Sequence, residues 1–176
     1  MEIYLRTLMK SDAPSMLEWM HDSTINEVFD KSFDHLKISD CESFIEQSHI
    51  HDSCNLDLAI STEGDSYVGT VSLKHINHQN RSAEFAIVIH PKYQGQGIAL
   101  QAMQEIGNIG FKLLGLKTIY LYVKKSNKRA NALYKKYGCL EISAKNLEDR
   151  GINPAYPNTE EELNWYEFKM DSRING

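Results

Sequence analysis

The sequence predicts a mixed α/β fold with its strands grouped in the middle of the chain. Residues 56–89 hold three runs with strand-like patterns, and segments with helical periodicity or capping signals flank them on both sides. The chain has 176 residues, of which 41% are hydrophobic and 24% charged. This is enough for one domain with a sizeable core, so we expect a single domain over residues 1–176.

The first 50 residues predict one short strand followed by helices. Residues 3–7 alternate as a strand does, and Ser11 or Asp12 is suited to cap a helix. Residues 27–35 indicate a loop or a short helix, and a further helix is expected to begin near Ser39. Its inward-facing residues are expected to be Cys41, Phe44, Ile45 and Ile50.

The next 40 residues predict strands. Residues 56–60 alternate as a half-buried strand does, residues 67–73 form the next strand, and residues 84–89 the one after. Residues 75–82 are the polar connection between the last two. Because residues 85–89 are nearly all apolar, we expect that strand to be central and buried on both faces.

The rest of the chain predicts two helices and two strands. Residues 97–114 carry an apolar stripe at helical spacing, and residues 118–123 are rich in β-formers. Ser126 or Asn127 is expected to cap a second helix that Gly138 closes. The last two segments are an acidic loop at 145–163 and a final strand at 165–170.

A glycine loop carries the main chemical signal. Residues 85–99 read FAIVIHPKYQGQGIA, so a buried strand runs into a short loop that opens a helix. Gly95 and Gly97 allow a sharp turn, and the loop amides with the helix N-terminus favour a phosphate or pyrophosphate. An ordinary strand-to-helix turn explains the same letters. The loop lacks the Gly-Lys-Ser/Thr of a P-loop and the third glycine of a Rossmann fingerprint.

Two blocks resemble the signatures of the GNAT N-acetyltransferase superfamily. QGQGIA at 94–99 is similar to its Gln/Arg-x-x-Gly-x-Gly/Ala signature, and NKRANALYKKYG at 127–138 is similar to its second, about 30 residues later. The likeness covers residues 2–142. It implies a mixed, mostly antiparallel central sheet of about seven strands flanked by helices. Residues 81–99 further resemble spermidine, ribosomal-protein alanine and amino-sugar N-acetyltransferases.

The resemblance implies which residues hold acetyl-CoA. Backbone groups of Ile87, Val88 and Ile89 are expected to contact its pantetheine and thioester carbonyl, and Asn127 is expected to lie near the pantetheine. The loop amides are expected to hold its pyrophosphate. The loop residues are Gln94, Gly95, Gln96, Gly97, Ile98 and Ala99. The basic residues Lys124, Lys125, Lys128 and Arg129 either meet the CoA phosphates or form a solvated helix start.

Two side chains are candidates for proton transfer. Tyr134 matches the family tyrosine that often protonates the CoA sulfur, although helical spacing alone makes it a core aromatic. Glu84 stands in a run that otherwise looks buried, where an unpaired carboxylate is costly. It is expected to bind the acceptor ammonium or take its proton, or else to pair with Arg81 or Lys74.

The implied reaction is direct transfer of acetyl from acetyl-CoA to a primary amine. The acceptor is a small molecule such as a polyamine or amino sugar, or a protein N-terminus, and a homodimer is possible. The net charge of −5 disfavours nonspecific nucleic-acid binding, and it favours a cationic acceptor. Residues 160–162 either form a solvated acidic turn or attract that cationic acceptor.

Further features bear on compartment and metal binding. The three cysteines show no CxxC spacing, and no signal peptide or membrane span is evident, so we expect a cytoplasmic protein. No metal site is expected, because the HxxH at 75–78 indicates a loop. The alternatives are a noncatalytic acetyl-CoA-binding module of the same fold and an α/β binding domain with a chance QGQG loop.

Overall fold

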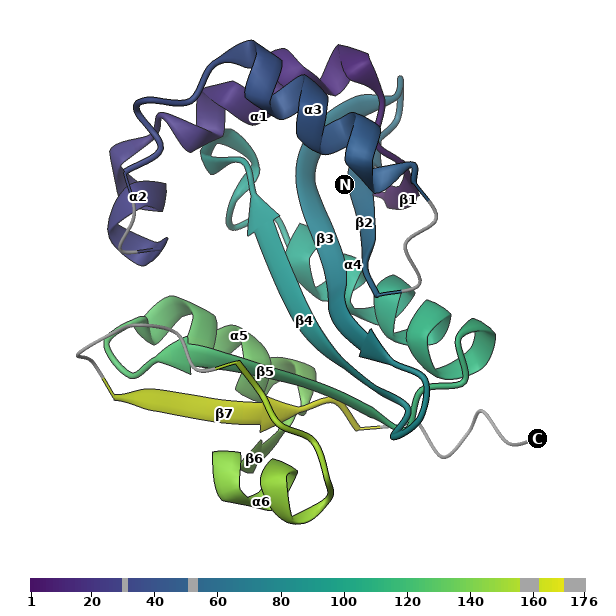
Figure 1. Ribbon diagram of the computed structural model, residues 1–176. Helices are drawn as coiled ribbons and strands as arrows, with labels where there is room; N and C mark the ends of the chain where they lie inside the picture. Colours follow the sequence, from purple (N-terminus) through teal and green to yellow (C-terminus); the bar gives the residue numbers. More distant parts are fainter. Residues whose placement is uncertain (30–31, 51–53, 156–161, 170–176) are drawn as a thin grey trace.

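One seven-stranded sheet runs through the molecule in the order β1-β2-β3-β4-β5-β7-β6. The computed structural model describes residues 1–29, 32–50, 54–155 and 162–169. Helices cover both faces of the sheet (Figure 1). Every strand pair is antiparallel except β4 with β5. The predicted fold class is therefore confirmed.

The elements follow one another along the chain with few long connections. The strands are β1 (Ile3–Thr7), β2 (Leu56–Thr62), β3 (Ser66–Asn77), β4 (Ser82–Ile89), β5 (Thr118–Lys124), β6 (Leu140–Ile142) and β7 (Leu163–Glu167). The helices are α1 (Ala13–Met20), α2 (Ser23–Phe29), α3 (Ile38–Ser48), α4 (Ile98–Asn108), α5 (Lys128–Tyr137) and α6 (Ala144–Asp149). Short helical turns are η1 (Lys10–Asp12), η2 (Pro91–Tyr93) and the π-helical η3 (Ile109–Leu113).

Four expectations about individual elements were wrong. The strand expected to be buried on both faces at 85–89 is only partly buried over residues 86–89, because β4 has no pairing with β5 beyond Glu84. The loop expected at 145–163 begins with α6, in which the Ser143 hydroxyl caps the Asn146 N–H at 3.1 Å and Leu147 is fully buried. Strand β3 continues to Asn77, because a register shift beyond Lys74 restores its pairing with β4. Ile50 is 67% exposed, since α3 ends at Ser48.

Other boundaries differ by less. The short β6 was not predicted, and β7 ends at Glu167, three residues before the end expected for the last strand. The helix expected at 97–114 is α4 followed by η3. Helix α2 begins at Ser23, earlier than the short helix or loop expected from residue 27.

The sheet consists of two arms that meet at a short seam. β4 and β5 pair through Ser82–Thr118, Ala83–Ile119 and Glu84–Tyr120, and beyond these pairs the two strands separate (Figure 1). We call these three pairs the β4–β5 seam. The N-terminal arm comprises β1–β4, and the C-terminal arm comprises β5, β7 and β6. The separation leaves one edge of β4 without a partner strand.

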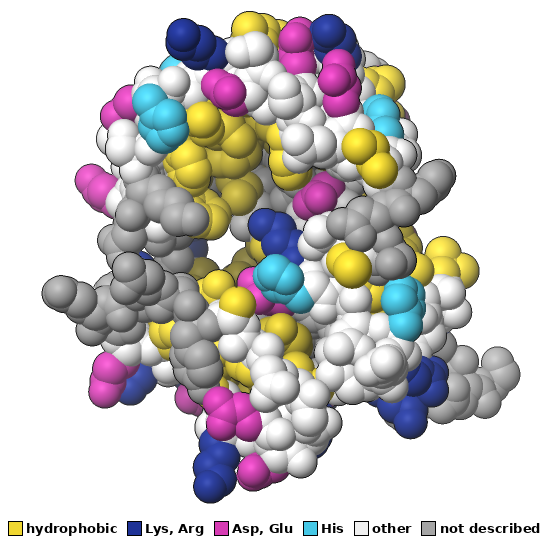
Figure 2. Space-filling view, viewed as in Figure 1, with side chains coloured by type: hydrophobic (Ala, Val, Ile, Leu, Met, Phe, Trp, Pro, Cys, Tyr) yellow, Lys and Arg dark blue, Asp and Glu magenta, His cyan; other side chains and the backbone are white. Residues whose placement is uncertain are grey.

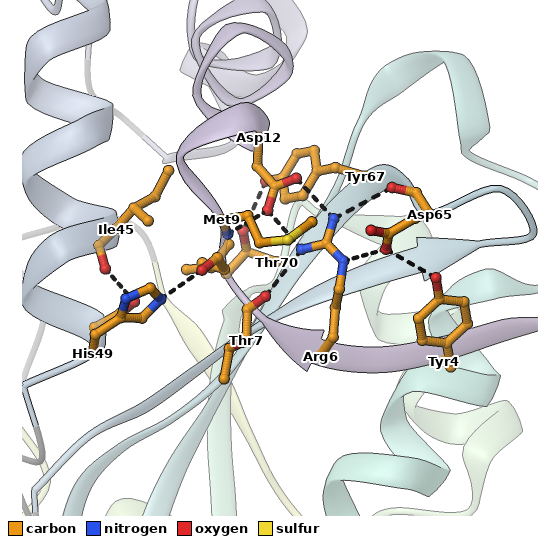
Figure 3. Close-up of polar contacts among 12 residues, drawn as sticks. Tyr4, Arg6, Thr7, Met9, Asp12, Ile45, His49, Asp65, Tyr67 and Thr70 are labelled. Atoms are coloured by element: carbon orange, nitrogen blue, oxygen red, sulfur yellow. Dashed lines mark hydrogen bonds and ion pairs between the residues drawn. The ribbon is translucent and has the colours of Figure 1, made fainter.

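A charged network fixes the start of the N-terminal arm. The Arg6 guanidinium lies between two carboxylates (Figure 3), with its Nη atoms 2.7 and 2.8 Å from Asp12 and its Nε 2.5 Å from Asp65. The Tyr4 hydroxyl donates to the same Asp65 at 2.9 Å. Asp12 is only 3% exposed. The network therefore ties β1 to η1 and to the β2–β3 turn.

A buried asparagine organises the C-terminal arm. Asn131 donates from Nδ2 to the carbonyls of Lys124 and Asn127 at 2.9 and 2.7 Å. Its Oδ1 accepts from Asn164 at 2.7 Å and from the Tyr166 hydroxyl at 2.8 Å. One side chain therefore joins α5 to the end of β5 and to β7.

Candidate functional site

The unpaired edge of β4 faces the gap between the arms. The His90 N–H donates to the Val68 carbonyl at 2.9 Å. In this antiparallel register the alternation pairs the backbone of Val88 with Thr70 and turns that of Ile87 and Ile89 toward the gap. Two of the three residues expected at the pantetheine thus present backbone groups to the gap. An extended ligand carrying amide groups can add to such an edge as a further strand does.

The glycine loop prepares an anion site at the end of this edge. Gly95 and Gly97 have φ values of 81° and 78°, which residues with a Cβ rarely adopt. Gly97 is the N-cap of α4 and has no side chain to cap the first N–H groups of that helix. These amides, which include those of Ile98 and Ala99, fit a pyrophosphate. The Ile98 side chain is 2% exposed, so only its backbone is available.

Gln94 connects the loop to both neighbouring elements. Its Nε2 donates to the Ile89 carbonyl at 2.9 Å, and its Oε1 accepts from the Arg129 guanidinium. Among the basic residues near the site, Arg129 therefore contacts the loop, whereas Lys125 pairs with Glu162 at 2.5 Å. Gln96 donates to the Lys92 carbonyl at 3.4 Å, which closes the turn.

Glu84 lies at the last pair of the seam, where the strands separate. It is 8% exposed, and within the described part of the chain its Oε2 has no hydrogen-bond partner. Burial raises the pKa of Glu84, while the nearby His75 and Lys74 and a hydrogen bond with the Tyr122 side chain oppose that shift. Arg81 is engaged elsewhere, since its Nε donates to the Gly115 carbonyl at 2.6 Å. No ion pair of Glu84 with Arg81 is found among the described residues, whereas the expected alternative of a pair with Lys74 stays a prediction, since Lys74 lies near enough to oppose the shift.

Tyr134 reaches the seam from the other arm. It is 8% exposed, and its ring lies 6.4 Å from that of Phe85 on β4 and 5.6 Å from that of Tyr166 on β7. Burial raises its pKa far above the ordinary value, so the phenol is protonated at neutral pH, as any tyrosine is, and is a weaker acid than an exposed one. Tyr134 is thus a core aromatic, and its hydroxyl is held in the form that can donate a proton.

Asn127 occupies the start of α5 beside the end of β5. Its Oδ1 accepts the Ala130 N–H at 3.0 Å, so it is the cap that the sequence left open between two residues. Its contact with the pantetheine stays a prediction. Asn131, one turn later, was not predicted. Its signal is a polar residue three positions before Tyr134, on the buried face of the same helix.

The surface is hollowed on the face that Figure 2 shows. Figure 2 shows a hollow between the two arms, lined by hydrophobic side chains. Within the described residues, no cluster of three or more metal-binding side chains is found. In the same part of the chain, no helix combines the length and the apolar character needed to span a bilayer. Glu160 and Glu161, considered for acceptor attraction, lie outside the described residues.

Solved structures with this architecture include spermidine N-acetyltransferases. The Vibrio cholerae enzyme in complex with CoA and spermine superposes with a TM-score of 0.77 at 24% identity, covering 94% of each chain. A chimera of that enzyme with a human one superposes with a TM-score of 0.78 at 22% identity and covers both chains fully. At these identities the likeness establishes the fold.

Sequence comparison points to the same group. The spermidine N(1)-acetyltransferase of Escherichia coli K12 is 37% identical over 122 residues, which are 66% of this chain and 64% of that protein. The Vibrio cholerae enzyme is 37% identical over 93 residues, or 53% of this chain and 54% of the other. The match therefore spans less than two thirds of these relatives. The GNAT acetyltransferase domain model matches residues 2–140, most of the length, and the chain belongs to that family.

Proposed function

We propose that this protein transfers acetyl from acetyl-CoA directly to a primary amine of a polyamine. The observation that carries the proposal is the arrangement at the β4–β5 seam. An open strand edge and an anion-binding loop lie on one side, with a buried carboxylate at the point where the strands part. The 37% identical relative is a spermidine acetyltransferase, which supports the choice of acceptor.

The residues of β4 and the loop orient the acyl donor. The backbone N–H groups of Ile87 and Ile89 face the gap and are available to the pantetheine and the thioester carbonyl oxygen. The amides from Gln94 to Ala99 hold the pyrophosphate without a strongly basic protein, which agrees with a net charge of −5. Hydrogen-bond donors fixed in place to stabilise the developing oxyanion charge make a large contribution to the rate enhancement of acyl transfer.

Glu84 is the residue that receives the acceptor amine. An ammonium cannot attack a carbonyl, so one proton has to leave it first. The raised pKa of Glu84 makes its carboxylate a better base than an exposed one, and its buried Oε2 has no hydrogen-bond partner among the described residues, so it can accept a bond from an ammonium that enters the seam. Carboxylate and ammonium together also remove the cost of an unpaired buried charge.

Tyr134 is the proton donor for the leaving thiolate. Its hydroxyl is protonated at neutral pH, and its ring is fixed by Phe85 and Tyr166 on opposite sides of the seam. The reaction thus needs both arms. The N-terminal arm supplies Glu84 and the loop, and the C-terminal arm supplies the acid.

An acceptor panel tests the proposal. Purified protein is mixed with acetyl-CoA and spermidine, spermine, glucosamine or a peptide with a free N-terminus, and released thiol is followed. We expect the two polyamines to give the largest kcat/KM. Faster turnover of glucosamine or the peptide would contradict the polyamine assignment and leave the reaction class intact.

The same panel separates the rival function. A noncatalytic module would bind CoA in calorimetry and release no thiol with any amine. Absence of both binding and turnover would overturn the whole proposal. A cytoplasmic location, a homodimer and protein N-termini as acceptors stay predictions from the sequence.

A further inference from the structure

The loop assigned to the pyrophosphate is held from outside by α1. The chain leaves β4 at His90, passes through η2 and reaches Gly95 and Gly97, at each of which an added Cβ would meet no atom within 4 Å. The two glycines therefore contribute no side-chain packing that would hold the loop in place. Besides the bonds of Gln94 and Gln96 and the buried Ile98 side chain, the position of the loop depends on the segment before the glycines.

His90 is the centre of that segment. It is 4% exposed, its backbone N–H donates to Val68, and its carbonyl accepts the Tyr93 N–H at 2.9 Å. Its Nδ1 accepts the Lys92 N–H at 3.2 Å. A ring nitrogen that accepts a backbone N–H carries no proton, so in the neutral ring the proton is on Nε2.

Glu18 of α1 contacts the segment at two points. Its Oε2 lies 3.4 Å from His90 Nε2, and its Oε1 accepts from the Lys92 ammonium. These partners keep the pKa of Glu18 below its ordinary value, Lys92 contributing most, so the carboxylate is charged. Asp22, between α1 and α2, also faces His90, and the Tyr93 ring lies 5.8 Å from the imidazole.

We propose that Glu18 is a positioning residue for the acetyl-CoA loop and acts through His90 and Lys92. The inference rests on the proposed function, because it assigns the loop to the cofactor. A surface ion pair alone contributes little to stability. Here one partner is a buried imidazole whose other nitrogen fixes the first turn of η2, so the contact sets the direction in which the chain approaches Gln94. A small displacement of a binding group can cost a large factor in the reaction.

Replacement of Glu18 separates positioning from folding. We expect Glu18→Ala to raise the Kd for CoA and the KM for acetyl-CoA about tenfold, while kcat at saturation and Tm stay near the wild-type values. Glu42→Ala is the matched control, since Glu42 on α3 pairs with Lys10 at 3.5 Å and does not contact the loop. This control is expected to bind CoA as the wild type does.

Two substitutions of His90 identify the atom that matters. Gln places an amide nitrogen near the position of Nε2 and can still reach Glu18, whereas Asn places an oxygen near Nδ1 and keeps only the contact with Lys92. We expect His90→Gln to bind CoA more tightly than His90→Asn. The reverse order would assign loop position to the η2 cap and overturn the role of Glu18.

The outcomes distinguish this inference from the proposed function. If the wild-type protein fails to bind CoA in calorimetry, the proposed function fails. If the wild type binds and Glu18→Ala binds equally well, the positioning role is wrong. A loss of kcat together with a lower Tm in Glu18→Ala would likewise overturn it, because that pattern indicates general destabilisation.

Discussion

The two arms of the sheet are held together by different interactions. In the N-terminal arm, long antiparallel ladders join β2, β3 and β4, and a cluster of its own packs beneath α1 and α3. The main apolar cluster is shared by both arms, since it also contains residues of β5, α5 and β7. The C-terminal arm has shorter strands and a small third cluster, and its elements meet at the polar side chain of Asn131. The N-terminal arm is thus a rigid support for the loop and Glu84. The C-terminal arm places Tyr134 through its ring contacts with Phe85 and Tyr166 and adds the polar contacts of Asn131.

Each arm carries its own spectroscopic reporter, so the comparison can be tested. The chain has two tryptophans. Trp19 is buried in the cluster beneath α1 and α3, and Trp165 is buried on β7. Fluorescence of single-tryptophan variants therefore follows each arm separately during denaturation.

The largest expected effect is on the C-terminal arm. Asn131→Ala removes the acceptor of the Tyr166 hydroxyl and of the Asn164 amide, while the carbonyls of Lys124 and Asn127 keep their backbone N–H partners. We therefore expect a loss of about 2 kcal/mol in the free energy of unfolding. Urea denaturation followed at Trp165 measures it. If the fluorescence of Trp165 changes at a lower urea concentration than that of Trp19 in this variant, the two arms unfold separately. If the two transitions coincide, the arms unfold as one cooperative unit.

Next in size is a loss of turnover without a loss of fold. Tyr134→Phe is expected to lower kcat about 10²-fold, because it removes the hydroxyl that we propose as the proton donor and keeps the packed ring. Tyr137→Phe, one turn later on α5, removes a hydroxyl that donates to the Met103 carbonyl at 3.2 Å and is the matched control. A change in kcat below about twofold for Tyr134→Phe would assign Tyr134 to packing alone.

A smaller effect concerns the pH dependence of stability. The pKa of Glu84 is raised on folding by burial, so folding favours the protonated carboxyl and stability falls as the pH rises above the ordinary carboxyl range. Glu84→Gln is therefore expected to have a higher Tm than wild type at pH 8, with the difference vanishing toward pH 4. The exposed Glu141 gives a control, since Glu141→Gln is expected to show no such trend. If the Tm of Glu84→Gln at pH 8 is equal to or below that of the wild type, the cost of burying the charged Glu84 carboxylate is offset by its neighbours in the wild type.

The smallest effect is at the surface of the C-terminal arm. Arg150 makes a two-pronged contact with Glu167, both distances being 3.0 Å. Lysine keeps the charge and loses one of the two bonds, so Arg150→Lys is expected to cost about 0.5 kcal/mol, measured by urea denaturation at Trp165. A cost above about 2 kcal/mol would place this pair beside Asn131 among the contacts that define the arm.

Much of this molecule could be predicted from local patterns. The alternation at 56–60, the apolar run at 85–89 and the stripe at 97–114 depend on neighbours within a few residues, and each predicted the correct type of element. The glycine loop was predictable for the same reason, since Gly97 both bends the chain and begins α4.

The remainder depends on contacts between distant residues. The seam ends at Glu84 and Tyr120, and no local pattern fixes where two strands part. Glu18 and His90 are separated by most of the N-terminal half, so their contact has no signature in either segment. Helix α6 was missed because its apolar signal consists mainly of Leu147, whose burial is decided by the third cluster.

The unpaired edge of β4 has a consequence for amide hydrogen exchange. Beyond the seam the strand alternates between N–H groups bonded to β3 and N–H groups turned to the gap, so exchange should alternate along it, slow at Val88 and fast at Ile87 and Ile89. Addition of CoA should slow Ile87 and Ile89 and leave Val88 unchanged, which would make the ligand a temporary eighth strand. The change in exchange rate at each residue of β4 would show which of its N–H groups bond to β3 and which bond to the cofactor.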